Sequence, residues 1–277
     1  MVILKSILHP LFLPFMQKAM IVSLLIGIIS SILSCFLILK GWSLIGDAIS
    51  HAVLPGIVIA YIFCIPLSIG AFLSGMFFTL STGFLKEHTR IKEDTLIGIV
   101  FSGMFAFGLL LFLKINTEKH LTHILFGNIL GMTRNEFFQV VYGTIIIFML
   151  LIFQYKDLLV YCFDLNHAKI IGLKTSFLHY GLLSLISFTI VLALQAIGII
   201  LVISMLITPG VIAFTVCKRF NSMLLVSILS SITSSFFGII LSFHIDAATG
   251  SCIVLIQSIY FILILISNFF YKKKIRN

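Results

Sequence analysis

Residues 41–63, GWSLIGDAISHAVLPGIVIAYIF, have the length and composition of a membrane-spanning helix, yet they include Asp47 and His51. At 1.5 Å per residue, such a segment is long enough to cross about 30 Å of hydrocarbon. An ionised side chain in hydrocarbon costs several kcal/mol unless it is paired or faces water. This stretch therefore predicts a membrane protein, and it raises the question of what the two polar groups do there.

The composition of the whole chain places it in the same class. The 277 residues are 60% hydrophobic and only 10% charged, and the mean hydropathy is +1.23. The apolar residues come in runs of about twenty, which predicts a polytopic helical membrane protein, whereas a β-barrel needs short alternating segments. The net charge of +9 fits basic residues in membrane-protein loops, so we expect no nucleic-acid partner.

The apolar runs predict an all-α transmembrane bundle that forms a single membrane domain over residues 1–277. Nine segments are predicted, and eight would cross if one is re-entrant. They cover residues 19–39, 43–63, 66–85, 95–113, 137–155, 176–197, 198–216, 223–243 and 248–270. Gly198 is the expected turn between the sixth and seventh segments. The Pro209-Gly210 pair predicts a seventh segment that is broken or only partly crossing.

The lysines and arginines predict how the segments are oriented. With the N-terminus outside and nine crossings, thirteen of the 18 basic residues fall on the inner side and five on the outer side. Basic residues concentrate in cytoplasmic loops, so this split favours that orientation. The inner set is Lys40, Lys86, Arg90, Lys92, Lys156, Lys169, Lys174, Lys218, Arg219, Lys272, Lys273, Lys274 and Arg276.

Asp47 and His51 are four residues apart, which places both side chains on one face of a helix. A carboxylate and an imidazole together form an oxygen and nitrogen ligand set suited to Mn(II), Fe(II) or Zn(II). One helix supplies only two ligands, and a two-fold dimer with this helix at its axis would supply four around a central pore. The alternative is a structural pair that locks two helices together, helped by Ser43 and Ser50.

The segment FDLNHAKIIGLKTSF, residues 163–177, is a polar interruption on the predicted inner side. Asp164 is a good N-cap, Ala168 to Ile171 can form a short helix, and Gly172 would end that helix. A short cytosolic helix between two spans is a lever on which a soluble partner can push. An ordinary connecting loop is the alternative.

Two other inner features have simpler interpretations. The letters GLKTS at 172–176 are no phosphate-binding loop, because that motif needs Gly and Lys to be adjacent and Leu173 separates them. We therefore expect no ATPase activity from this chain itself. Glu93 and Asp94 would lie in the first turn of the fourth helix, where acids suit the helix dipole, and a role at a partner interface is the alternative.

Several outer residues are weaker candidates. His244 and Asp246, at the end of the eighth segment, could capture a metal at the entrance of a pathway, although such a pair is often merely solvated. His120 and His123 have the same two interpretations. Gln195, near the end of the sixth segment, is deep enough to contact a pathway, and helix packing explains it equally well.

Six motifs in order make the chain resemble the ABC-3 family of permease subunits from bacterial metal importers. The most similar members are the Sit/Yfe-type manganese and iron permeases. The motifs are LKGWSLIGDAISHAVLPGIVIAY at 39–61, TRIKEDTLIGIVFSGMFAFGLL at 89–110, LFGNILG at 125–131, FDLNHAKIIGL at 163–173, LQAIGIILVISMLITPGVIAF at 194–214 and DAATGSCIVLIQ at 246–257.

The resemblance implies a multi-pass protein of the bacterial inner membrane that imports a divalent metal. Iron or manganese is the expected cargo, zinc is less expected, and no cofactor is permanently bound. The implied partners are cytosolic ABC ATPase subunits, a second permease subunit (identical or a sister chain) and an extracytoplasmic metal-binding protein. By the same resemblance, Asp47 and His51 fall on the intramembrane metal site. Asp164, Ala168 and Gly172 fall on the ATPase-coupling helix.

Two other classes of function are left open by the residues alone. An ion-coupled transporter could use Asp47 and His51 as a proton relay and would work without an ATPase. An intramembrane metallohydrolase would need three protein ligands and a base. No HExxH or comparable cluster is present in the sequence, which disfavours the hydrolase.

Overall fold

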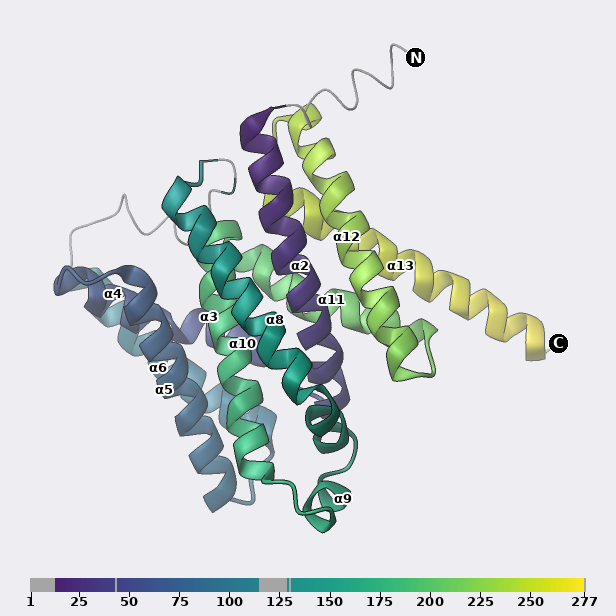
Figure 1. Cartoon of the computed structure of the whole chain (residues 1–277), viewed down its shortest axis with the longest axis horizontal. Coiled ribbons are helices and arrows are strands. Elements are labelled where there is room, and N and C mark those ends of the chain that lie inside the picture. Colours follow the sequence, from purple (N-terminus) through teal and green to yellow (C-terminus); the bar gives the residue numbers. More distant parts are fainter. Residues whose placement is uncertain (1–12, 43, 115–128, 130, 277) are drawn as a thin grey trace.

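The computed structural model describes residues 13–42, 44–114, 129 and 131–276, and this part of the chain is helical, without a strand (Figure 1). The helices are α2 Pro14–Lys40, α3 Ile45–Ala52, α4 Leu54–Ile62, α5 Leu67–His88, α6 Glu93–Lys114, α8 Arg134–Phe163, α9 Leu165–Ile170, α10 Thr175–Ile197, α11 Ile199–Val216, α12 Phe220–Ile245 and α13 Thr249–Arg276.

The prediction of about nine spans is confirmed, because nine helical stretches among the described residues are long and apolar enough to cross a membrane. Several helices extend beyond the predicted apolar runs. The largest extension is in α8, whose 30 residues correspond to about 45 Å, which exceeds the hydrocarbon thickness. The extension of α8 at its C-terminal end begins with Lys156 and Asp157 and continues to Phe163.

The centre of the bundle is α2, which packs against α8, α11 and α12. Small hydroxyl residues allow α2 and α12 to approach closely, and Ser227 of α12 donates a hydrogen bond to the Ser31 carbonyl of α2 at 3.0 Å. Such small polar contacts are typical of helix packing in membranes. By contrast, α6 and α13 lie at the periphery. Only 17% of the apolar stretch of α6 and 11% of that of α13 are buried.

The connections alternate between the two ends of the bundle, as successive crossings require. In Figure 1 the end that holds α9 also holds the α5–α6 connection, and the N-terminal end of α8 lies at the opposite end. Following the orientation predicted from the basic residues, these are termed the inner end and the outer end.

The prediction that the seventh segment is broken is wrong, since α11 runs without interruption through Pro209. The side chain of Ser34 on α2 contacts α11 beside this proline. Its hydroxyl donates to the Ile207 carbonyl and accepts from the Gly210 N–H, both at 3.1 Å. The carbonyl that Pro209 leaves without its donor is that of Met205, four residues earlier, so Ser34 does not replace the lost bond but ties α11 to α2 on both sides of the proline. The turn at Gly198, between α10 and α11, is where it was predicted.

Residues Ile45–Ile62 form one span, as the sequence predicts, and the helix is divided locally at Val53, which keeps helical φ and ψ. α3 ends at Ala52, Val53 intervenes, and α4 begins at Leu54. Pro55 has no N–H to donate to the carbonyl of His51, four residues earlier, which interrupts the hydrogen-bond ladder there. α4 is held against α5 by backbone contact at Gly56 and Gly70, where a Cβ on either residue would overlap the carbonyl of the other.

Candidate metal translocation site

Asp47 and His51 lie on one face of α3 and contact each other. His51 Nε2 is 3.4 Å from Asp47 Oδ1, and the two side chains are 32% and 45% exposed. The other residues of α3 are buried against the bundle and fix its orientation. The sequence spacing therefore predicted correctly that both groups face the same side.

Two phenylalanines of α6 surround the His51 ring. The ring centre lies 5.8 Å from that of Phe101 and 5.3 Å from that of Phe105, the latter in an edge-on arrangement. The sequence did not identify these residues, because two phenylalanines one turn apart in an apolar span look like ordinary lipid-facing residues. They form an apolar wall that restricts the orientation of the imidazole.

The geometry disfavours a structural pair that joins two helices. Ser50, which was expected to help such a pair, donates instead to the Gly46 carbonyl of its own helix at 2.7 Å, and Ser43 lies outside the described residues. Within the part of the chain that the structure describes, the Asp47–His51 contact lies inside α3 and joins no second helix. In the same part, no three His, Cys, Asp or Glu side chains are close enough to hold a metal.

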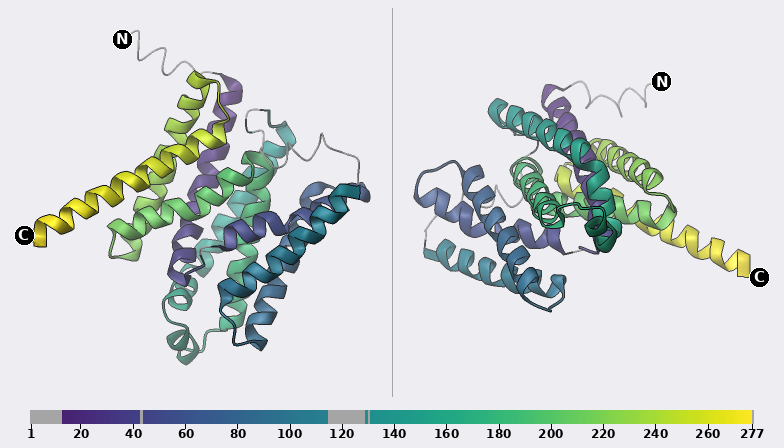
Figure 2. Two further views of the ribbon diagram at one scale, coloured as in Figure 1. Left: turned by 180° about the vertical axis from the view of Figure 1, so that it is seen from behind. Right: turned by 60° about the horizontal axis from the view of Figure 1, so that its bottom comes forward.

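The face of α3 that carries the pair reaches the surface of the chain. From behind, α3 is visible between α6 and α11 (Figure 2), and it packs against both helices. Partly exposed Asp47 and His51 side chains cannot face hydrocarbon without a cost of several kcal/mol, by general estimates of about 2.5–3.5 for a central aspartate. This face therefore requires a polar surrounding, either water or another protein surface.

At the inner end, α9 is a six-residue helix with defined caps. The Asp164 carboxylate accepts hydrogen bonds from the N–H groups of Asn166 and His167, at 2.8 and 3.2 Å. At the other end Gly172 has a φ of +86°, and the Leu173 N–H donates to the Ala168 carbonyl at 3.0 Å. This is a Schellman-type cap, which favours glycine at that position.

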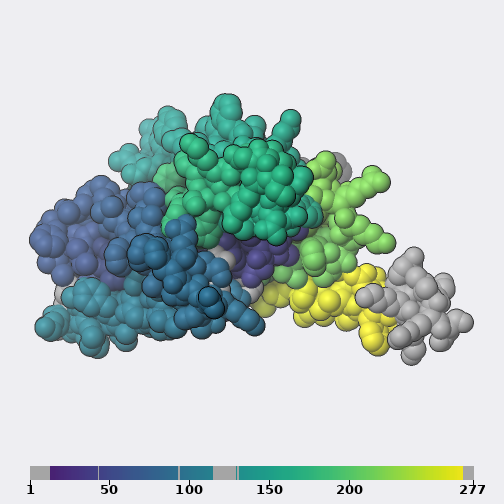
Figure 3. Space-filling model, turned by 90° about the horizontal axis from the view of Figure 1, so that it is seen from below, coloured from purple at the N-terminus to yellow at the C-terminus, as the bar shows by residue number. Residues whose placement is uncertain are grey.

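The predicted caps of α9 are thus confirmed, and the predicted start was three residues too late. The sequence suggested a helix from Ala168, whereas α9 begins at Leu165 directly after its cap. The Ala168 side chain is buried, while Ile170 and Ile171 are 83% and 57% exposed. Seen from the inner end (Figure 3), the green α9 region stands beside the blue α5–α6 connection. The inner end therefore presents apolar side chains on a short capped helix.

The structure does not bring the outer candidates together. His244 Nδ1 donates to the Ile240 carbonyl of its own helix at 2.9 Å, and Asp246 is the left-handed C-cap residue of α12. Both side chains are exposed, and they form no ion pair within 4 Å. His120 and His123 lie outside the described residues.

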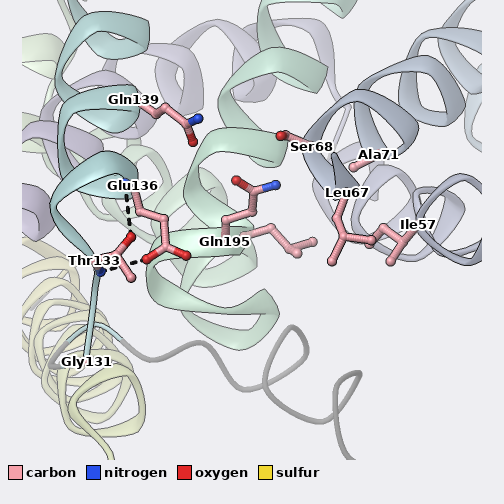
Figure 4. A pocket seen from close by; sticks show the side chains of 10 residues that line it. Ile57, Leu67, Ser68, Ala71, Gly131, Thr133, Glu136, Gln139 and Gln195 are labelled. Atoms are coloured by element: carbon pink, nitrogen blue, oxygen red, sulfur yellow. Dashed lines mark hydrogen bonds between the residues drawn. The ribbon is translucent and has the colours of Figure 1, made fainter. Parts of the chain in front are cut away.

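A cavity of about 420 Å³ lies at the outer end between α4, α5, α8 and α10. Figure 4 shows the polar groups of Ser68, Gln139 and Gln195 facing the same space. Glu136 also lines this cavity, and its carboxylate accepts from the Thr133 N–H at 2.8 Å as part of a helix capping box. Gln195 thus borders a cavity, but neither Asp47 nor His51 lines it.

Comparison with known proteins identifies the class to which this helical bundle belongs. The chain matches the ABC 3 transport family over residues 12–268, and it is therefore a member of that family. The resemblance inferred from the six sequence motifs is confirmed, as is the assignment to multi-pass membrane proteins.

Two relatives and one solved structure are particularly informative. The chain is 55% identical to the chelated iron transport system membrane protein YfeD of Yersinia pestis, over 94% of the chain and 88% of that protein. It is 48% identical to the manganese transport system membrane protein MntB of Synechocystis, over 94% and 85%. PsaBC from Streptococcus pneumoniae, solved in complex with a Fab, superposes with a TM-score of 0.83 at 35% identity, over 94% and 95%.

Proposed function

We propose that this chain is the membrane-spanning permease subunit of a binding-protein-dependent ABC importer for iron or manganese in the bacterial inner membrane. Residues 1–277 act as one permease domain, and a separate ATPase subunit supplies the energy. The observation that carries the proposal is the Asp47–His51 pair, an incomplete set of metal ligands on a helix face that needs a polar surrounding. The iron and manganese relatives support the choice of cargo.

A second permease subunit, identical or a sister chain, would complete the metal site. Two pairs related by a two-fold axis supply two carboxylates and two imidazoles, which suit Mn(II) and Fe(II). His51 Nε2 and Asp47 Oδ1, the atoms that face each other at 3.4 Å, are the atoms that would bind the cargo. The ligands replace part of the water shell of the metal during passage, and the metal must bind weakly enough to leave.

The ATPase would act through α9. Ile170 and Ile171 are exposed apolar side chains at the inner end, and a soluble partner would bury them. Rigid capping at Asp164 and Gly172 lets α9 move as a unit with the adjoining ends of α8 and α10. ATP-driven closure of the ATPase subunits would thereby switch the permease pair between outward-open and inward-open forms.

An extracytoplasmic metal-binding protein would deliver the cargo at the outer end. His244 and Asp246 are exposed there on the last residues of α12 and the turn that follows. Their side chains would offer a first contact for the incoming metal. They are separate from the pair on α3 in the chain and belong to a different helix.

The test is uptake of radioactive manganese or iron by cells that co-express the permease, its ATPase and its binding protein. Asp47→Asn removes one ligand charge and keeps the side-chain shape. We expect uptake to fall at least about tenfold, the range in which changes near metal ligands operate. Normal uptake by the Asp47→Asn variant would exclude this residue from the pathway.

Two controls separate the loss of a metal ligand from the effect of any carboxylate change and identify the energy source. Asp157→Asn changes an exposed carboxylate on α8 in the same way and should leave uptake within about twofold, as expected for a surface substitution. An ATPase subunit with a disabled nucleotide site should abolish uptake. Continued uptake with that subunit, together with sensitivity to a proton uncoupler, would instead support an ion-coupled transporter.

A further inference from the structure

Four side chains form a cluster at the inner ends of α2, α8 and α10. Tyr161 and His179 are joined by a hydrogen bond of 2.9 Å between the phenol oxygen and Nδ1. The Trp42 ring meets the His179 ring edge-on, with 5.3 Å between the ring centres. Lys40 Nζ lies 3.5 Å from the centre of the Tyr161 ring. We refer to these four residues as the inner aromatic cluster.

The cluster stands between the two segments to which the proposed function assigns roles. Tyr161 is in the last turn of α8, three residues before Asp164, the cap of α9. Trp42 follows the end of α2 and precedes Asp47 by five residues. His179 belongs to α10, which packs against both α3 and α9. The cluster therefore links the end of α8 that precedes α9 to the chain segment that precedes α3.

The contacts are suited to transmitting a displacement. Tyr161 and Trp42 are 2% and 3% exposed, so their rings are enclosed by neighbours and cannot turn away without disturbing the packing. A buried hydrogen bond in a low-dielectric surrounding is strengthened, and edge-on aromatic contacts have a preferred direction. A shift of the inner end of α8 would thus move His179 and Trp42 rather than be absorbed by side-chain rotation.

We propose that Tyr161, His179 and Trp42 mechanically couple α9 to α3, so that engagement of the ATPase repositions Asp47 and His51. This inference rests on the proposed function, and it makes the three residues positioning residues that do not touch the cargo. The cluster could instead serve only to anchor three helix ends. A purely structural anchor would affect expression and stability, but it would leave the amount of metal moved per ATP unchanged.

The experiment uses the complete transporter in proteoliposomes, with the second permease, the ATPase and the binding protein, and with Mn(II) as cargo. Tyr161→Phe removes the hydroxyl and keeps the ring over which Lys40 lies. ATP hydrolysis should stay within twofold of wild type, while Mn(II) imported per ATP falls about two- to tenfold, the effect of losing one net hydrogen bond.

The same helix provides a matched control. Tyr155 of α8 donates its hydroxyl to Asn221 Oδ1 of α12 at 2.9 Å, outside the cluster. Tyr155→Phe removes an equivalent hydroxyl and should keep the wild-type ratio of Mn(II) to ATP. An equal fall in both variants would refute the coupling role, because it would indicate a general weakening of α8.

A double variant tests whether the residues act as one unit. Trp42→Phe should also lower the ratio, and the combination of Trp42→Phe with Tyr161→Phe should be no worse than about the larger single effect, since coupled residues are not additive. If the effects of the two substitutions multiply, or if Tyr161→Phe keeps the wild-type ratio of Mn(II) to ATP, the coupling inference is refuted. Neither result would refute the proposed function. Absence of any ATP-dependent import by the wild-type complex would overturn the proposed function as well.

Discussion

Substitution of Gly172 perturbs the C-terminal cap of α9 in a graded way. Its φ is +86°, and outside its chain neighbours no described atom lies within 4 Å of the position a Cβ would take. Alanine therefore adds backbone strain without a clash, at a cost of roughly 1–2 kcal/mol, and asparagine tolerates this region better. Proline cannot adopt this φ and removes the N–H that donates to the Lys169 carbonyl at 3.1 Å, costing about 3 kcal/mol or more.

These energies translate into populations of the capped form of α9. A cost of 1–2 kcal/mol lowers the ratio of capped to uncapped α9 by roughly five- to thirtyfold, and 3 kcal/mol lowers it by more than about a hundredfold. If α9 transmits the movement of the ATPase, the metal imported per ATP should fall in the order Gly172→Asn, Gly172→Ala, Gly172→Pro. The assay is simultaneous measurement of ATP hydrolysis and Mn(II) import by the reconstituted complex.

A glycine in ordinary helical conformation provides the control. Gly103 on α6 has open space around a Cβ and no left-handed φ, so Gly103→Ala should be neutral or slightly stabilising. Equal import per ATP across the whole Gly172 series would refute the reasoning, and so would wild-type import by Gly172→Pro.

Two further predictions concern packing and the candidate site. Ser34→Ala removes both hydrogen bonds to α11 beside Pro209 and should lower the free energy of unfolding by about 1 kcal/mol in mixed-micelle denaturation, since such bonds average about 0.6 kcal/mol in membranes. The control Ser230→Ala, which loses only a bond to its own helix, should change it little, and equal values for the two would contradict the role of Ser34. Phe105→Leu removes the edge contact to His51 and should weaken Mn(II) binding about two- to tenfold at unchanged expression, the value of one aromatic pair. Unchanged Mn(II) affinity would show that the ring does not orient the imidazole.

Most of the fold could be predicted because apolar length alone determines which segments cross a membrane. The two prolines within spans show what the local sequence cannot predict. Pro55 coincides with the division between α3 and α4, whereas α11 continues through Pro209, where Ser34, about 170 residues earlier in the chain, bonds the helix on both sides of the proline. A contact between residues so far apart leaves no trace in the local pattern.

The candidate site could be predicted where the local sequence determines it, and could not be predicted where it depends on contacts between helices. The spacing of Asp47 and His51 determines their shared face on any helix, and Asp164 and Gly172 carry the cap signals of α9. The phenylalanines beside His51 and the contact between Tyr161 and His179 depend on how separate helices pack. Phenylalanine is common in this chain, with 28 residues, and the sequence does not show which helix ends bring Tyr161 and His179 together.

The break at Val53 has a consequence for how the pair on α3 can move. α4 contacts α5 through the backbone at Gly56 and Gly70. The hydrogen bond that Pro55 cannot donate would have ended on the carbonyl of His51. Because that hydrogen bond is absent, bending the chain at this point costs less than bending it within α3 or α4. Since Asp47 and His51 both lie on the α3 side of this point, a bend there would reorient the two donor atoms together.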